Sequence, residues 1–133
     1  MSRGNDYVSA ATRRFVAQRA HFRCEYCLLA ERDMGFSAEI DHIIAVKHRG
    51  SSDPSNLAFS CWVCNGNKGS DIASIVEKTD EISRFFNPQV DVWSEHFRLN
   101  NFRIEPLTPI GEVTEFIFRF NDEDRIEERS VLF

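Results

Sequence analysis

The sequence lacks long apolar runs, and from its opening residues we expect no secretory leader. Apolar stretches such as Ile43 to Val46 are far shorter than the about 20 residues that a membrane-spanning helix needs. The opening residues, Met1 to Asp6, contain no apolar segment of the kind that secretory signals carry. We therefore expect a cytoplasmic protein without a membrane partner.

Basic residues are in the minority, with 16 Lys and Arg against 21 Asp and Glu and a net charge of −5. Residues 1–70 carry nine basic and seven acidic side chains, whereas residues 71–133 carry seven and fourteen. An acidic total weakens general attraction to phosphates without forbidding a local basic site. Such a site could be formed by the basic residues of the first half: Arg13, Arg14, Arg19, Arg23, Lys47, His48, Arg49 and Lys68. For the first four, a merely solvated basic face is an equally good interpretation.

Cysteine is scarce too, with four in 133 residues, and all four fall in two Cys-x-x-Cys pairs, Cys24–Cys27 and Cys61–Cys64. In a reducing compartment such pairs indicate zinc rather than disulfides. Two pairs complete a tetrahedral four-cysteine site with Zn–S bonds of about 2.3 Å and no open position, so the predicted zinc is structural. A rubredoxin-like iron site and a redox dithiol are the alternatives, although the dithiol lacks the expected βαβ context.

Between and directly behind these pairs stand Asp41, His42, Asn56 and Asn65. Phosphodiester hydrolysis needs an activated water, a cation beside the phosphate and a stabilised leaving oxygen. A histidine with its ordinary pKa of about 6.5 can take a proton from water at neutral pH. Asp41 and Asn65 offer the oxygen ligands that a hard divalent cation prefers. Because neighbours in a strand point to opposite faces, we expect a bend at Asp41 and His42.

Local patterns in the first half predict alternating short helices and strands. A helix with Ser9 or Asp6 as its cap is expected first, and the strands flank a loop rich in Gly, Ser, Asp and Pro. The expected segments are a helix at Val8–Ala20, a short helix at Leu28–Asp33, a strand at Phe36–Ile44, a loop at Lys47–Ser55, a strand at Asn56–Ser60 and a helix at Cys64–Gly69.

The second half predicts two hairpins and a helix. One hairpin joins residues 71–76 to 81–86, and the other spans Phe97 to Leu107 with its turn at Asn100-Asn101. Thr108-Pro109 is a good helix start, yet residues 115–120 also alternate like a strand; we favour the helix. Eight of the twelve Phe follow residue 84, so this half is expected to build core. We expect one domain, 1–133, with a core at 20–70 and an extension at 71–133.

The stretch Glu39 to Ala45, with Gly50, Asn56-Leu57 and Cys61-x-x-Cys64-Asn65-x-x-Lys68-Gly69, closely resembles the HNH nucleases that carry zinc knuckles. Segments after residue 85 also resemble small stand-alone bacterial HNH proteins. The resemblance implies an α+β fold in which a ββα-metal finger is stapled by a four-cysteine zinc site, with a C-terminal β-hairpin and helix extension. It also implies a metal-dependent endonuclease that acts on DNA, with RNA left open.

The same resemblance implies roles for individual residues. His42 would be the general base, and Asn56 would fix the loop and the orientation of His42. Asp41 and Asn65 would hold the catalytic Mg²⁺ or Mn²⁺. Lys68 would sit on the helix near phosphate. From their charge beside the motif, and not from the resemblance, we expect Lys47 and Arg49 to contact the substrate as well. The sequence departs from colicin-type DNases in having Asn65 where they have histidine, and an oxygen ligand there suits Mg²⁺ or Mn²⁺.

A second function stays open, a noncatalytic zinc module that binds nucleic acid or a protein through its acidic second half. The set Asp41, His42, Asn56 and Asn65 favours the nuclease, because a binding module has no need of all four. Trp62, between two cysteines, suits either the core or a base-stacking platform, and we favour the core.

Overall fold

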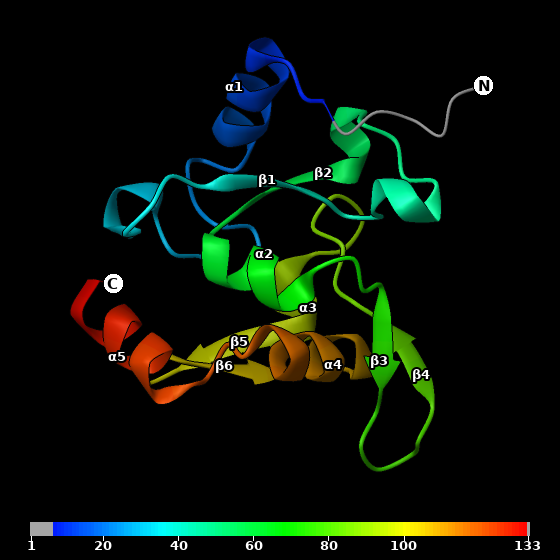
Figure 1. The fold of residues 1–133 in the computed structure, drawn as a ribbon. Helices are drawn as coiled ribbons and strands as arrows, with labels where there is room; N and C mark the ends of the chain where they lie inside the picture. Colours follow the sequence, from blue (N-terminus) through cyan, green and yellow to red (C-terminus); the bar gives the residue numbers. More distant parts are fainter. Residues whose placement is uncertain (1–6, 133) are drawn as a thin grey trace. The chain divides into compact units, whose positions relative to one another are not determined.

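The computed structural model describes residues 7–132 and places them in two compact units that divide between Ser70 and Asp71 (Figure 1). Each unit combines short helices with paired strands, so the fold is α+β, as predicted. None of the helices within residues 7–132 has the length and apolar character required to cross a membrane.

The first unit begins with helix α1, Ala10–Arg19. The Ser9 hydroxyl accepts a hydrogen bond from the Thr12 amide at 3.1 Å, which satisfies one of the free amides of the first turn. The helix is therefore confirmed, with Ser9 as its cap, while Asp6 lies outside the described residues. His21 and Phe22 both take positive φ angles and turn the chain away from the helix.

Strands β1, Glu39–His42, and β2, Leu57–Ser60, pair antiparallel from Glu39 opposite Ser60 to His42 opposite Leu57. All four residues of β2 are buried. Helix α1 packs against this sheet and closes a small apolar core made of Val8, Val16, Leu57 and Phe59. Both predicted strands are confirmed, and the first is shorter than expected.

Helix α2, Trp62–Lys68, follows β2 directly and packs against β1. It ends at Gly69, whose φ of +54° suits a residue without a side chain. The helix predicted at Leu28–Asp33 shrinks to a single 3-10 turn, Glu31–Asp33. Leu28 takes a φ of 72°, and Ala30 forms an isolated antiparallel β-bridge with Arg23. Both features belong to the turn around Cys24–Cys27, the first knuckle, and are incompatible with a helix there.

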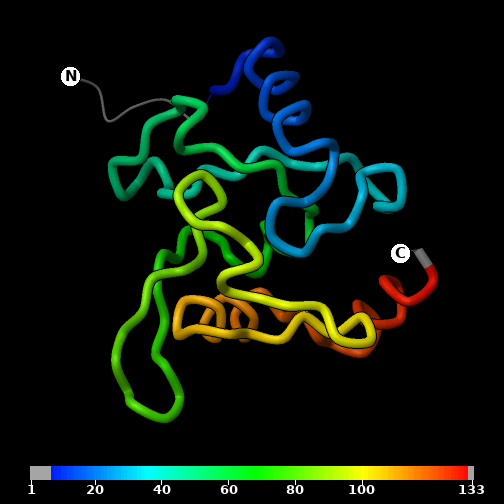
Figure 2. Tube along the Cα trace, turned by 180° about the vertical axis from the view of Figure 1, so that it is seen from behind, coloured from blue at the N-terminus to red at the C-terminus, as the bar shows by residue number. Residues whose placement is uncertain are grey.

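Within its described residues, 71–132, the second unit contains two hairpins and three helices. The hairpins predicted at 71–86 and 97–107 are confirmed, and the turn of the first stands clear of the rest of its unit (Figure 2). The elements are β3, Ala73–Ile75; β4, Ile82–Arg84; α3, Trp93–His96; β5, Phe97–Asn100; β6, Arg103–Pro106; α4, Pro109–Phe118; and α5, Glu123–Leu132. The second turn lies one residue later than predicted, at Asn101 and Phe102, because both have the positive φ that a tight hairpin turn requires.

Helix α4 resolves the ambiguity between helix and strand in favour of the predicted helix. The Thr108 hydroxyl caps it by accepting from the Gly111 amide at 3.0 Å, and Pro109 occupies its first turn. Arg119, with a φ of 58°, ends the helix and turns Phe120 back into the interior. As predicted, phenylalanines build the core of this unit, with edge-to-face contacts among Phe85, Phe86, Phe97, Phe118 and Phe120.

Helix α5 was not predicted from the sequence. Its segment is rich in charge, but two of its arginines are buried and donate to main-chain oxygens. Arg125 reaches the Phe118 carbonyl at 2.8 Å, and Arg129 reaches those of Phe102 and Phe120 at 2.7 and 2.8 Å. Polar side chains thus hold this helix against its unit, which apolar periodicity cannot reveal.

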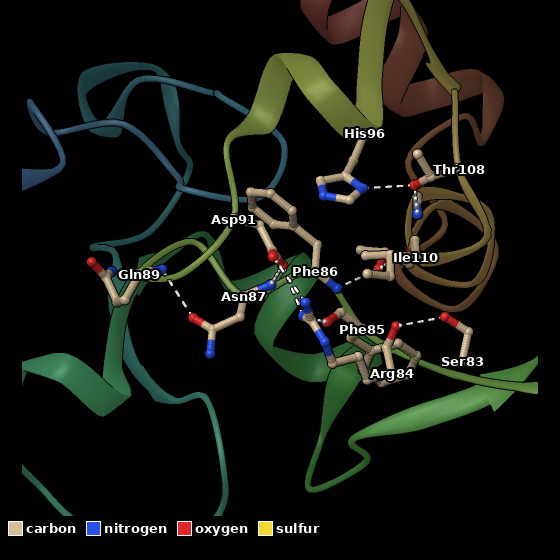
Figure 3. Close-up of polar contacts among 12 residues, drawn as sticks. Ser83, Arg84, Phe85, Phe86, Asn87, Gln89, Asp91, His96, Thr108 and Ile110 are labelled. Atoms are coloured by element: carbon tan, nitrogen blue, oxygen red, sulfur yellow. Dashed lines mark hydrogen bonds and ion pairs between the residues drawn. The ribbon is translucent and has the colours of Figure 1, made fainter.

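A polar network orders the chain between β4 and α4 (Figure 3). Arg84 binds both oxygens of Asp91, at 2.8 and 2.9 Å, and the Asn87 amide donates to the same carboxylate. Nδ1 of His96 lies 2.6 Å from the Thr108 hydroxyl. The hydrogen bond from Arg84 lowers the pKa of Asp91. The contacts of Asp91 brace residues 85–92, which lie between β4 and α3 and have no regular secondary structure. The contact of His96 joins α3 to the cap residue of α4.

Candidate functional site

The four cysteines meet in one buried cluster within the first unit. Their sulfur atoms all lie within 4.8 Å of one another, and those of Cys27 and Cys61 are 3.7 Å apart. A tetrahedral site with Zn–S bonds of about 2.3 Å has sulfur–sulfur edges of about 3.8 Å. The cluster therefore fits a zinc ion bound by Cys24, Cys27, Cys61 and Cys64.

Each knuckle turns a backbone amide toward a sulfur. The amides of Cys27 and Cys64 donate to the sulfurs of Cys24 and Cys61, both at 3.4 Å. Such donors favour thiolates, whereas burial raises the pKa of Cys64. A divalent cation in the centre would offset that burial, since a coordinated thiol is deprotonated. The ion would join the segment 24–27 to the start of α2.

The Asp41 carboxylate is buried between the first knuckle and α2. The Tyr26 hydroxyl donates to one carboxylate oxygen at 2.6 Å, and Nζ of Lys68 donates to the other at 3.2 Å. Burial raises the pKa of Asp41, and the charge of Lys68 and the hydrogen bond from Tyr26 oppose this rise. The carboxylate is thus held from two sides by residues 15 and 27 positions away in the chain.

Lys68 is buried as deeply as Asp41. Its ammonium group also donates to the backbone carbonyl of His42, at 3.1 Å. These bonds tie α2 to the end of β1. We expected Lys68 to contact phosphate, but here its charged end faces the interior of the unit.

Asn65 also faces β1, one helical turn before Lys68. Its Nδ2 donates to a carboxylate oxygen of Glu39 at 2.7 Å. Within the described part of the chain, no hydrogen bond joins Asn65 to Asp41 directly. Glu39 and Asp41 lie two residues apart and therefore on one face of β1, so Asn65 and Asp41 belong to the same β1–α2 contact.

His42 is half-buried at the last position of β1. Its Nε2 lies 2.9 Å from the Ser52 hydroxyl, in the loop that joins the two strands. Strand pairing continues without a break through Asp41 and His42, and the chain bends only at Ile43 and Ile44. The bend expected between Asp41 and His42 is therefore wrong, and these two side chains project to opposite faces of the strand.

The side chain of Asn56 closes the loop between the strands. Its oxygen accepts from the Ile44 amide at 2.9 Å, while its nitrogen donates to the carbonyls of Ile44 and Ser51 at 2.9 and 2.7 Å. We call these three hydrogen bonds of Asn56 the loop clamp. Only glycine fits beside it at position 50, because the Cβ of any other residue would lie 1.6 Å from the Ile44 oxygen. Lys47, His48 and Arg49 lie in the same loop and are exposed.

Several basic residues of the predicted patch instead brace the fold. Arg19 donates to the carbonyls of Pro54 and Leu57 at 2.9 and 2.8 Å, and Arg23 donates to that of Leu28. Arg13 and Arg14 stay exposed on α1.

Trp62 is 48% exposed and meets Phe36 edge-to-face at 5.5 Å, so the core position that we favoured for it is wrong. The side chain stands on the first turn of α2.

Among the described residues, three side chains that contact the side chains of expected site residues were missed in the sequence. These are Tyr26, Glu39 and Ser52, which contact Asp41, Asn65 and His42 in that order. The position of Tyr26 could have been used, because a tyrosine between two zinc ligands must lie close to the elements that pack against the zinc site. The loop residue Ser52 offered no such signal, since its contact depends on how the loop closes.

Comparison with known proteins gives a match to a protein family. Residues 24–71 match the family model described as HNH endonuclease. This segment contains both knuckles, β1, β2 and α2 and ends one residue past the boundary between the units. Neither the curated proteins nor the solved structures gave a match to the chain. This segment is therefore similar to HNH endonuclease domains, a family of nucleases.

Proposed function

We propose, on the premise that residues 24–71 are an HNH domain, that this chain is a metal-dependent endonuclease that hydrolyses DNA phosphodiester bonds. In this proposal β1, β2 and α2 form the ββα-metal finger, stapled by the zinc bound to the four cysteines. The observation that carries the proposal is the position of His42. It ends the strand that carries Asp41, and a closed loop holds its ring.

His42 is proposed as the general base. When the Ser52 hydroxyl accepts a hydrogen bond from Nε2, the imidazole is protonated there and carries its lone pair on Nδ1. Among the described residues, Nδ1 of His42 has no hydrogen-bond partner, so it is available to accept a proton from water. Asn56 supports this arrangement indirectly, since its clamp closes the loop that carries Ser52.

Asp41 and Asn65 are proposed to hold the catalytic Mg²⁺ or Mn²⁺. A carboxylate has about four acceptor positions, and Tyr26 and Lys68 use two of those on Asp41, so acceptor capacity remains. Carboxylate and amide oxygens are the donors that hard divalent cations select, so the residues fit the group. When bound, the cation would supply charge stabilisation for the phosphate and the leaving oxygen.

The remaining basic residues divide into two roles in this proposal. Lys68 acts on Asp41, because its buried ammonium group holds that carboxylate ionised and in place. Lys47 and Arg49 stand exposed on the loop beside His42 and are proposed to contact the phosphate backbone. Backbone contacts position a nucleic acid without reading its sequence.

The test is nicking of supercoiled plasmid at low salt with Mg²⁺, Mn²⁺ or EDTA, after zinc content and circular dichroism have been checked. Wild type is compared with His42→Ala and with His48→Ala, the exposed loop histidine, as a matched control. We expect metal-dependent nicking by wild type and His48→Ala, and a loss of at least about a hundredfold in His42→Ala. A parallel reaction on single-stranded RNA compares the two nucleic acids.

Equal nicking by the folded His42→Ala protein would contradict the role of His42. Absence of nicking by folded, zinc-loaded wild type would contradict the endonuclease. It would favour the noncatalytic zinc module, which would bind nucleic acid or a protein through its acidic second half.

A further inference from the structure

Glu39 stands outside the residues that the proposed chemistry uses, yet it contacts one of them. It opens β1 with an exposed side chain, and its Oε1 accepts a hydrogen bond from Nδ2 of Asn65 at 2.7 Å. The contact joins two residues that are 26 positions apart in the chain. It is therefore a product of the packing of α2 on β1 and not of local sequence.

The chemistry of this contact decides which way the Asn65 amide faces. An ionised carboxylate only accepts hydrogen bonds, so Glu39 can be met by the NH2 end of the amide and never by its oxygen. Without such a partner, the two ends of an asparagine amide exchange places at small cost. With it, the Asn65 oxygen is turned away from Glu39 and left for another ligand.

Two hydrogen bonds between side chains join β1 to α2. Glu39 and Asp41 lie on one face of the strand, and Asn65 and Lys68 lie one turn apart on the helix. Lys68 binds Asp41 and Asn65 binds Glu39. The hydrogen bond between Glu39 and Asn65 thus orients the Asn65 amide oxygen, and it does so within the same strand–helix contact that holds the Asp41 carboxylate.

We propose that Glu39 is a positioning residue that turns the amide oxygen of Asn65 toward the divalent cation. The inference rests on the proposed function, since it assumes that Asp41 and Asn65 hold that cation. Partners that orient a metal ligand typically change metal affinity by about 10–100-fold when they are removed. Glu39 is exposed and its loss removes no core contact, so the fold and the zinc site are expected to survive its substitution.

The experiment measures Mn²⁺ binding to the full, zinc-loaded chain by electron paramagnetic resonance, without nucleic acid. Glu39→Ala removes the acceptor, whereas Glu39→Gln removes only the charge, because a glutamine oxygen still accepts from Asn65. Asp33→Asn controls for the loss of a negative charge in the same unit. We expect Glu39→Ala to weaken Mn²⁺ binding about tenfold or more, with Glu39→Gln and Asp33→Asn within about threefold of wild type.

Unchanged Mn²⁺ affinity in Glu39→Ala would overturn the inference. Equal weakening in Glu39→Ala and Glu39→Gln would also overturn it, since charge and not orientation would then be the cause. If wild type binds no Mn²⁺, Asn65 has no cation to face, and the inference is overturned as well. Plasmid nicking by the same proteins separates the two proposals. Nicking that persists while Glu39→Ala binds Mn²⁺ normally would leave the endonuclease standing and reject the role of Glu39.

Discussion

The ammonium nitrogen of Lys68 lies 3.2 Å from a carboxylate oxygen of Asp41, and the two side chains are only 2% and 4% exposed. Desolvation makes such a pair costly unless further hydrogen bonds satisfy both partners. Here Tyr26 donates to the second oxygen of Asp41, and the His42 carbonyl accepts from Lys68. The pair therefore contributes a defined placement of α2 on β1, at the strand end where the candidate base stands.

Lys68→Met should destabilise the first unit by about 3–5 kcal/mol, because it leaves the Asp41 carboxylate buried without its cation. Urea unfolding of zinc-loaded protein measures the effect. Lys47→Met, an exposed lysine of the same unit, serves as the control and should change stability by less than about 0.5 kcal/mol. Adding Asp41→Asn should restore part of the loss. Equal stability of the two lysine variants would contradict this prediction.

Tyr26→Phe should keep zinc and fold but cost about 1–3 kcal/mol, since it removes the donor 2.6 Å from a buried Asp41 oxygen. Plasmid nicking should fall as well if Asp41 holds the cation. Tyr7→Phe is the matched control, because that tyrosine is 69% exposed. The measurements are zinc content, urea unfolding and nicking rate. Wild-type stability in Tyr26→Phe would show that the hydroxyl contributes nothing to the placement of Asp41.

Gly50→Ala should open the loop between β1 and β2, since its Cβ would lie 1.6 Å from the Ile44 oxygen and 2.9 Å from Nδ2 of Asn56. We expect at least about a tenfold loss of nicking with zinc content unchanged, because the cysteines lie outside this loop. Gly35→Ala, where a Cβ meets nothing within 4 Å, should behave as wild type. Full activity of Gly50→Ala would argue that the loop clamp does not position His42.

Cys61→Ala should lose zinc and unfold the first unit, because the binding energy of a structural metal is folding energy. The side chain also accepts from the Cys64 amide at the start of α2, so its loss weakens that helix start directly. Zinc content and circular dichroism report the result, and EDTA added to wild type at elevated temperature should reproduce it. A folded, stable, zinc-free Cys61→Ala protein would be incompatible with a structural role for the metal.

Acid should weaken the second unit through Asp91. The hydrogen bond from Arg84 lowers the pKa of Asp91, so the unfolded chain binds this proton more readily than the folded one. Its contribution is therefore complete above the ordinary pKa of about 4 and is lost as the pH falls through the lowered value. Because Arg84 is half exposed, the expected size is on the order of 1 kcal/mol.

The matched measurement for Asp91 uses fluorescence of Trp93, the one tryptophan of the second unit, in a Trp62→Phe background. Stability to urea should decline between about pH 4 and pH 2 in this background, and Asp91→Asn should flatten that decline. The same slope in both proteins would assign the acid sensitivity to another group.

The sequence by itself determined the features that depend on near neighbours in the chain. The spacing of Cys24–Cys27 and Cys61–Cys64 predicted the buried cluster. Alternation with turn residues predicted the hairpins, and the Thr108-Pro109 start predicted α4. Each of these signals lies within a few residues, where backbone geometry leaves little choice.

Only the tertiary structure decided what the site residues touch. Lys68 is charged and was expected at the surface, yet Asp41 and the His42 carbonyl hold it inside. Helix α5 formed although its segment lacks an apolar stripe, because buried arginines bind carbonyls across its unit. Such contacts join residues far apart in the chain, so they depend on strand register and helix placement. Composition and periodicity cannot express those quantities, and for that reason the contacts of Glu39 and Ser52 emerged only from the fold.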